Sequence, residues 1–131
     1  EIKAYYGRWQ EMFGGCDEQC VAILENLHQQ KNCRLLVLTN WSGETFHTAK
    51  NMYPFLDLFE GIVISGDEKI KKPDPRLYQI LIDRYSIQPG RSIFVDDTKI
   101  NVEVAVDLGF QTIHFLSANQ LHEELRKWGL M

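Results

Sequence analysis

Residues 92–109 read SIFVDDTKINVEVAVDLG, and this stretch decides the fold class. Its apolar beginning is typical of a strand that is buried on both faces of a parallel sheet. Asp96 and Asp97 end that strand, and an apolar helical pattern follows and stops at Gly109. Two adjacent carboxylates repel each other, so they require a solvated turn or a nearby cation. The stretch therefore predicts a strand, an acidic turn and a helix, which is one unit of an α/β fold.

The same alternation of short apolar strands and helices runs through most of the chain. Strands are predicted at residues 35–38, 62–64, 92–96 and 112–115, and a short helix at residues 43–51. Asp74 and Pro75 suit the first positions of one helix, and Ser117 with Gln120 fits a capping box at the last helix. Short connections between these elements predict an α/β class with a parallel sheet and right-handed crossovers.

Composition excludes several classes of protein. The 131 residues suffice for one domain with a real core, and 44% apolar with 24% charged residues is ordinary globular composition. The net charge of −4 and the lack of a basic block argue against a nucleic-acid partner. Apolar runs are too short to span a membrane, and no stretch resembles a signal peptide. Three cysteines argue against a disulfide framework and for a reducing compartment, so we expect a cytoplasmic protein.

Polar side chains follow three of the four predicted strands. Ligands of open parallel sheets bind beyond the carboxyl ends of the strands, which directs attention to these positions. A hydroxyl, a backbone N–H and a lysine can hold phosphate oxygens, and paired carboxylates suit Mg²⁺. The set therefore predicts a site for a phosphoryl group and its metal ion. Its members are Thr39, Asn40 and Trp41, then Lys71 and Lys72, then Asp96, Asp97 and Thr98.

Each of these residues, taken alone, has a simpler explanation. Thr39 and Asn40 could be turn residues, and Lys72 could be a solvated loop charge. Asp97 or Thr98 could cap the following helix. Their combination at strand ends, in this order, favours the functional interpretation.

Three stretches resemble motifs of the haloacid dehalogenase-like (HAD) hydrolases. LLVLTN resembles the second motif, KKPDP the third, and FVDD with its following helix the fourth. The spacings, 33 residues from Thr39 to Lys72 and 24 from Lys72 to Asp96, suit the family. The resemblance covers residues 15–131 and implies a Rossmann-like, doubly wound parallel sheet. It is nearest to the members with a helical cap inserted before the second motif.

The resemblance also implies a role for each site residue. Thr39 and Asn40 would bind the phosphoryl group through a hydroxyl and a backbone N–H. Lys72 would neutralise the phosphoryl group and the nucleophile. Asp97 aligns with the main metal ligand and Asp96 with the second acidic residue. The implied cofactor is Mg²⁺.

The first motif of the family, Asp-x-Asp, is absent, because no two aspartates are separated by one residue. In the family, its first Asp is the nucleophile, on a central strand between those that end at Thr39 and Asp96. We therefore expect that this central strand is missing and that the chain alone is inactive. Residues 2–13 have a helical stripe, so residues 1–14 are interpreted as the last helix of an inserted cap. Residues 15–131 are then the C-terminal part of the Rossmann-like core.

Within the family, a phosphatase acting on a small phosphorylated metabolite through an aspartyl-phosphate is the preferred function. A 2-haloacid dehalogenase is the alternative. Members with that activity resemble one another in having Ser or Asn where this sequence has Asp96 and Asp97, so the two carboxylates favour the phosphatase. A signalling receiver domain is disfavoured by the order Thr39, Lys72, Asp96. A non-catalytic binding module stays open. Trp41 is expected either to face the cap and substrate or to be a packed aromatic.

Overall fold

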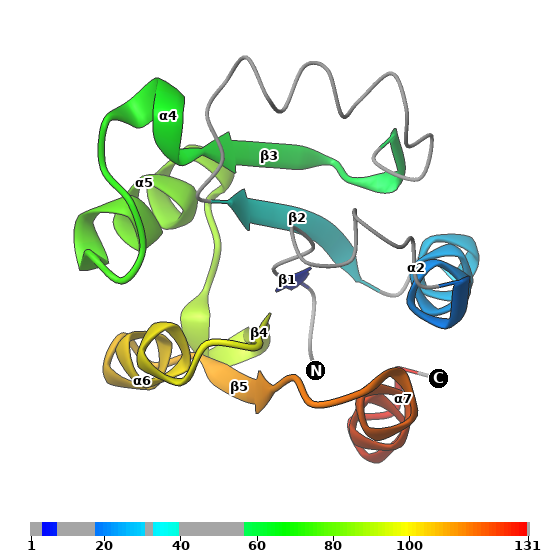
Figure 1. Ribbon diagram of the computed structural model, residues 1–131. Coiled ribbons are helices and arrows are strands. Elements are labelled where there is room, and N and C mark those ends of the chain that lie inside the picture. The colour runs from blue at the N-terminus through cyan, green and yellow to red at the C-terminus, as the bar shows by residue number, and fades with distance from the viewer. Residues whose placement is uncertain (1–3, 8–17, 31–32, 40–56, 131) are drawn as a thin grey trace.

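The computed structural model describes residues 4–7, 18–30, 33–39 and 57–130, and these form a five-stranded sheet covered by helices on both faces (Figure 1). The order of the strands is β3-β2-β1-β4-β5, and every pairing is parallel. The α/β class with a doubly wound parallel sheet is therefore confirmed. The strands are β1 (Ala4–Gly7), β2 (Arg34–Thr39), β3 (Gly61–Ile64), β4 (Ser92–Asp96) and β5 (Gln111–His114).

Two helical layers bury the two faces of the sheet. α2 (Glu18–Gln30) and α7 (Ala118–Lys127) pack on one face, and α5 (Pro75–Tyr85) and α6 (Lys99–Asp107) on the other (Figure 1). Alternate residues of each strand point to opposite faces of the sheet. Leu35 of β2 therefore packs in the core under α2 and α7, and Leu36 in the core under α5 and α6. Within the described ranges, no helix is long and apolar enough to cross a bilayer.

The centre of the sheet differs from the sequence-based expectation. β1 lies between β2 and β4, where a strand was expected to be missing. Its Tyr6 is level with Leu36 on one side and Phe94 on the other. The expected helix over residues 2–13 is therefore wrong for Ala4–Gly7, and the rest of residues 1–14 lies outside the described residues. The physical reason is that β2 and β4 each present backbone groups that need partners, and pairing with both outweighs a local helical pattern.

The predicted helix caps are present. The Asp74 side chain accepts a hydrogen bond from the backbone N–H of Arg76 at 2.9 Å. Ser117 accepts from the backbone N–H of Gln120 at 3.1 Å. The Gln120 side chain, however, accepts from the N–H of Leu116 and not from that of Ser117, so the capping box is displaced by one residue.

The connection after β3 contains structure that the sequence did not indicate. No helix was predicted between the second strand and Asp74, but α4 (Ser65–Glu68) opens this connection as a short helix. The predicted helix at residues 43–51 lies outside the described residues. The chain after α4 leads through Lys72 into α5, which brings this lysine back toward the sheet.

Candidate active site

The carboxyl edge of the sheet gathers the ends of β2 and β4 on either side of β1. Val37, Gly7 and Val95 are level in the two pairings, so Thr39 and Asp97 come two residues beyond this common row. Adjacent strands are about 4.8 Å apart, which separates the β2 and β4 backbones by about 10 Å. Asn40 and Trp41 lie outside the described residues, and so does the Thr39 side chain.

Lys72 and Asp96 form an ion pair inside this edge. The Lys72 Nζ lies 2.8 Å from Oδ2 of Asp96, and both side chains are fully buried. The neighbouring Lys71 is exposed. The structure therefore places Lys72, and not Lys71, beside the acidic turn, as the motif resemblance implies.

The Asp96 carboxylate accepts several hydrogen bonds, which fix its orientation. Its Oδ2 accepts from the Asn101 side-chain amide at 3.2 Å as well as from Lys72. Its Oδ1 accepts from the backbone N–H of Thr98 at 2.8 Å. Thr98 is the N-cap of α6 but makes no side-chain capping bond there. Asp96 therefore organises the turn before α6, whereas Thr98, one of the two residues considered above as a cap, occupies the N-cap position.

Asp97 is half-buried and lies nearer to solvent than Asp96. Its backbone carbonyl lies 3.0 Å from Nε2 of His114, the last residue of β5. A carbonyl oxygen only accepts hydrogen bonds, so this geometry requires the proton to be on Nε2. His114 was missed in the sequence analysis because the fourth strand was predicted to end one residue later, at Phe115. Counting His114 as the end of that strand would have placed it at the same edge.

Tyr78 is a second residue that the sequence did not single out. It is fully buried in α5, and its hydroxyl donates to the backbone carbonyl of Asn101 at 2.8 Å. Burial, and then the negative charge of Asp96, raise the pKa of this hydroxyl, so Tyr78 remains a proton donor at neutral pH. The only signal in the sequence was its place next to Leu77 on the buried stripe of α5.

The donor chemistry of this turn fits Mg²⁺ in part. Carboxylate oxygens are ligands that Mg²⁺ prefers, and the ion usually keeps several waters. The ammonium group of Lys72 already neutralises Asp96, so Asp97 is the better-placed ligand. Among the described residues, no group of three or more His, Cys, Asp and Glu side chains could hold a metal ion. The described part of the chain thus offers at most this carboxylate pair, and the other ligands of a bound Mg²⁺ would be waters, substrate or residues from elsewhere.

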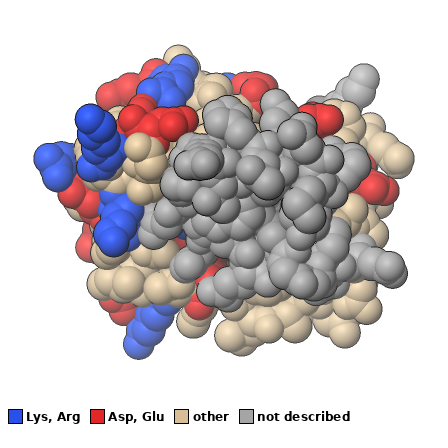
Figure 2. Space-filling model, turned by 45° about the horizontal axis from the view of Figure 1, so that its top comes forward, with Lys and Arg blue, Asp and Glu red and all other residues tan. Residues whose placement is uncertain are grey.

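Charged side chains on the flank formed by α4 to α6 are mixed in sign. Figure 2 shows basic and acidic side chains next to one another on this side of the molecule. Arg84 pairs with Glu68 of α4, and Arg76 with Asp74 at 2.8 Å. Such exposed pairs contribute little to stability. They do balance the charge on this flank.

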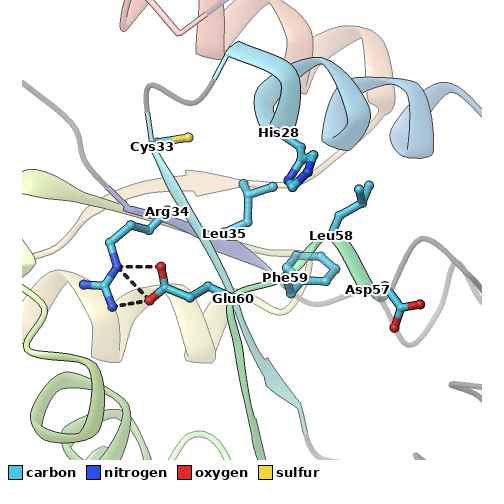
Figure 3. Close-up of a pocket in the computed structure, with 8 residues that line it drawn as sticks. All are labelled: His28, Cys33, Arg34, Leu35, Asp57, Leu58, Phe59 and Glu60. Carbon is cyan, nitrogen blue, oxygen red and sulfur yellow. Dashed lines mark hydrogen bonds and ion pairs between the residues drawn. The ribbon is translucent and has the colours of Figure 1, made fainter.

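A separate cavity of about 370 Å³ lies at the opposite edge of the sheet, where β2 begins (Figure 3). Arg34 crosses its rim, with Nε 2.9 Å from Oε2 of Glu60 and Nη1 2.7 Å from the carbonyl of Tyr85. Burial raises the pKa of Cys33 to about 11, so this thiol is protonated and unreactive at neutral pH. None of the predicted site residues is among those that line it, which are His28, Cys33, Arg34, Leu35, Asp57, Leu58, Phe59 and Glu60.

Comparison with known proteins identifies the family. The profile of the family described as haloacid dehalogenase-like hydrolase matches residues 4–115. The chain therefore belongs to the haloacid dehalogenase-like hydrolases, as the three motifs suggested.

Curated relatives carry different activities in their names. The chain is 41% identical over 87 residues to acyl-CoA dehydrogenase family member 10 of Mus musculus (63% of this chain, 8% of that protein). It is 30% identical over 116 residues to the sesquiterpene phosphatase astK of Aspergillus oryzae (86% and 59%). It is 30% identical over 91 residues to (S)-2-haloacid dehalogenase 4A of Burkholderia cepacia (68% and 39%). The chain thus spans between 8% and 59% of the length of these three relatives.

Solved structures share the fold over most of the chain. An uncharacterised protein of Corynebacterium glutamicum superimposes with a TM-score of 0.82 at 18% identity, covering 100% of this chain and 98% of that one. A HAD family enzyme of Bacteroides thetaiotaomicron, solved with magnesium and inorganic phosphate, gives a TM-score of 0.69 at 16% identity (86% and 93%). At these identities the likeness establishes the Rossmann-like fold.

Proposed function

We propose that this chain is part of a magnesium-dependent HAD phosphatase that hydrolyses a small phosphorylated metabolite. The observation that carries the proposal is the buried Lys72–Asp96 pair beside Asp97, at the same sheet edge as Thr39. A net charge of −4 favours a small substrate over nucleic acid. The low, odd number of cysteines argues against a disulfide framework, which favours a reducing compartment such as the cytoplasm.

Each site residue has a task in this reaction. Thr39 and Asn40 bind phosphoryl oxygens, and Lys72 neutralises charge on the phosphoryl group and the attacking carboxylate. Asp96 fixes the position of Lys72. Asp97 would hold Mg²⁺, which supplies positive charge against the phosphoryl dianion when bound.

The chemistry needs a nucleophile, and the sequence has no Asp-x-Asp motif that would provide it. β1 holds the central position, but its sequence, AYYG, has no carboxylate. We propose that a longer polypeptide supplies an aspartate on a strand that takes the place of β1 between β2 and β4. Its carboxylate would attack phosphorus as the P–O bond to the alcohol breaks, and water would then hydrolyse the aspartyl-phosphate.

The test is hydrolysis of p-nitrophenyl phosphate by the longer reading frame, with and without Mg²⁺. We expect Mg²⁺-dependent turnover that Asp97→Ala lowers by at least about 100-fold, the size of effect seen when one electrostatic stabiliser is removed. Asp107→Ala, at an exposed position of α6, is the matched control and should leave the rate unchanged. Full activity of Asp97→Ala, or turnover by residues 1–131 alone, would contradict the proposal.

A dehalogenase is the second candidate, because a haloacid dehalogenase is among the relatives at 30% identity. The two carboxylates of FVDD argue against it, since a carboxylate pair suits a metal-assisted reaction of a phosphate dianion. Release of chloride from 2-chloropropionate without Mg²⁺ would decide for this candidate.

A non-catalytic binding module is the third candidate, and the carboxylate-free central strand β1 favours it. This candidate requires that the longer reading frame contains no Asp-x-Asp motif before residue 1. A magnesium titration of the longer protein against its Asp97→Asn variant then shows whether the acidic turn still binds the ion.

A further inference from the structure

Tyr78 connects α5 to the acidic turn. Its hydroxyl donates to the carbonyl of Asn101, and the Asn101 side-chain amide donates to Asp96 Oδ2, the oxygen that also holds Lys72. All four residues are buried. We propose that Tyr78 is a positioning residue that keeps the Lys72–Asp96 pair in its reactive orientation through Asn101. This inference rests on the proposed function for its effect on catalysis.

A second contact links Tyr78 to the same pair. The Tyr78 ring packs against Phe94 with centroids 5.3 Å apart, and Lys72 Nζ lies 6.0 Å from the Phe94 centroid. Phe94 is two residues before Asp96 on β4. Tyr78 therefore supports both partners of the pair, one through Asn101 and the other through Phe94.

The sequence between Lys72 and Tyr78 explains how one segment provides both groups. Asp74 and Pro75 start α5 directly after Lys72, and Tyr78 follows within the first turn of the helix. The start of α5 therefore sets the separation between the ammonium group and the phenol. The raised pKa of the buried hydroxyl keeps it protonated, so it donates to Asn101 throughout the physiological pH range.

Tyr78→Phe removes this donor and retains the ring. Tyr85→Phe is the matched control, because it makes the same chemical change at the other end of α5, beside Gly61. In the longer protein, we expect Tyr78→Phe to lower kcat about 5-fold, the worth of one buried hydrogen bond, and to leave KM within about 2-fold. Tyr85→Phe should behave as the wild type. Equal kcat values for the two variants would overturn the proposal.

A double-mutant cycle separates positioning from a general loss of stability. If Tyr78 acts through Asn101, Tyr78→Phe should change kcat by less than about 2-fold in an Asn101→Ala background. An undiminished 5-fold effect there would overturn the proposed route.

Hydrogen exchange of the same longer protein tests the inference without requiring activity. The Thr98 amide is bound to Asp96 Oδ1, so its exchange should accelerate in Tyr78→Phe and stay unchanged in Tyr85→Phe. If phosphatase turnover is absent but Thr98 exchange responds as stated, the proposed function fails and the positioning role of Tyr78 stands. Unchanged Thr98 exchange in Tyr78→Phe would overturn the positioning role.

Discussion

At the scale of single residues, the Lys72–Asp96 ion pair is a feature that substitution of either partner should disrupt strongly. Both side chains are fully buried, so removal of one partner leaves a charge without its counter-ion in a low-dielectric site. We expect Lys72→Met to lower the free energy of unfolding by about 3–5 kcal/mol, measured by urea denaturation. The matched control is Lys71→Met at the exposed neighbour, which should change it by less than about 0.5 kcal/mol. Similar values for the two variants would mean that the pair is not formed.

At the scale of elements, the beginning of α5 depends on the charge of Asp74. The Arg76 side chain, with help from its backbone N–H, lowers the pKa of Asp74. A lowered pKa means that the stabilisation is present above the ordinary Asp pKa of about 3.9 and is lost as the pH falls through the folded-state value. Asp74→Ala should therefore be less stable than the wild type at pH 7, and the difference should shrink below about pH 4.

Asp74→Asn is the control for this pH dependence, because its amide oxygen can still accept the capping bond without a titrating charge. As the pH is lowered, the unfolding temperature of Asp74→Asn should fall no more steeply than that of Asp74→Ala. If the wild type remained more stable than Asp74→Ala by the same amount at pH 2, the charge of Asp74 would not be the source of the stabilisation.

The end of α5 approaches β3 at Gly61 so closely that a side chain there would collide with Tyr85. A Cβ atom on Gly61 would lie 2.2 Å from Cζ of that ring. Gly61→Ala should cost about 1–3 kcal/mol, the usual range for overpacking. Gly90→Ala is the control, since a Cβ there would meet no atom within 4 Å. The double variant Gly61→Ala/Tyr85→Ala should lose less than the sum of the two single changes, and additive losses would contradict the contact.

At the scale of the whole molecule, β1 completes the sheet. A chain that begins at residue 8 would leave the facing backbone groups of β2 and β4 without partners, so we expect it to aggregate or unfold. A chain that begins at residue 4 keeps β1 and is the control. Size-exclusion chromatography and circular dichroism distinguish the two. A folded monomer beginning at residue 8 would show that β1 is dispensable.

Strands whose ends are marked by a change from apolar to polar residues could be predicted from the sequence. β4 matches the predicted range 92–96 in full, because an apolar run and an acidic turn mark both of its ends. β1 was not predicted, because the aromatic spacing in residues 2–13 also suits a helix and its strand partners lie far away in the chain. Tyr78 was missed because it binds a backbone carbonyl, and such an acceptor leaves no mark in the sequence. His114 was missed because the fourth strand was predicted to end one residue after it.

The central position of β1 has a consequence for the order of folding. Ala4 pairs with Arg34 and with Ser92, which are 30 and 88 residues further along the chain. During synthesis on a ribosome, β1 emerges before both of its neighbours, and the second of them, β4, begins only 88 residues after Ala4. Such non-local pairing slows folding and lengthens the time for which strand edges are exposed. We therefore expect the nascent chain to depend on protection by chaperones until β4 has emerged.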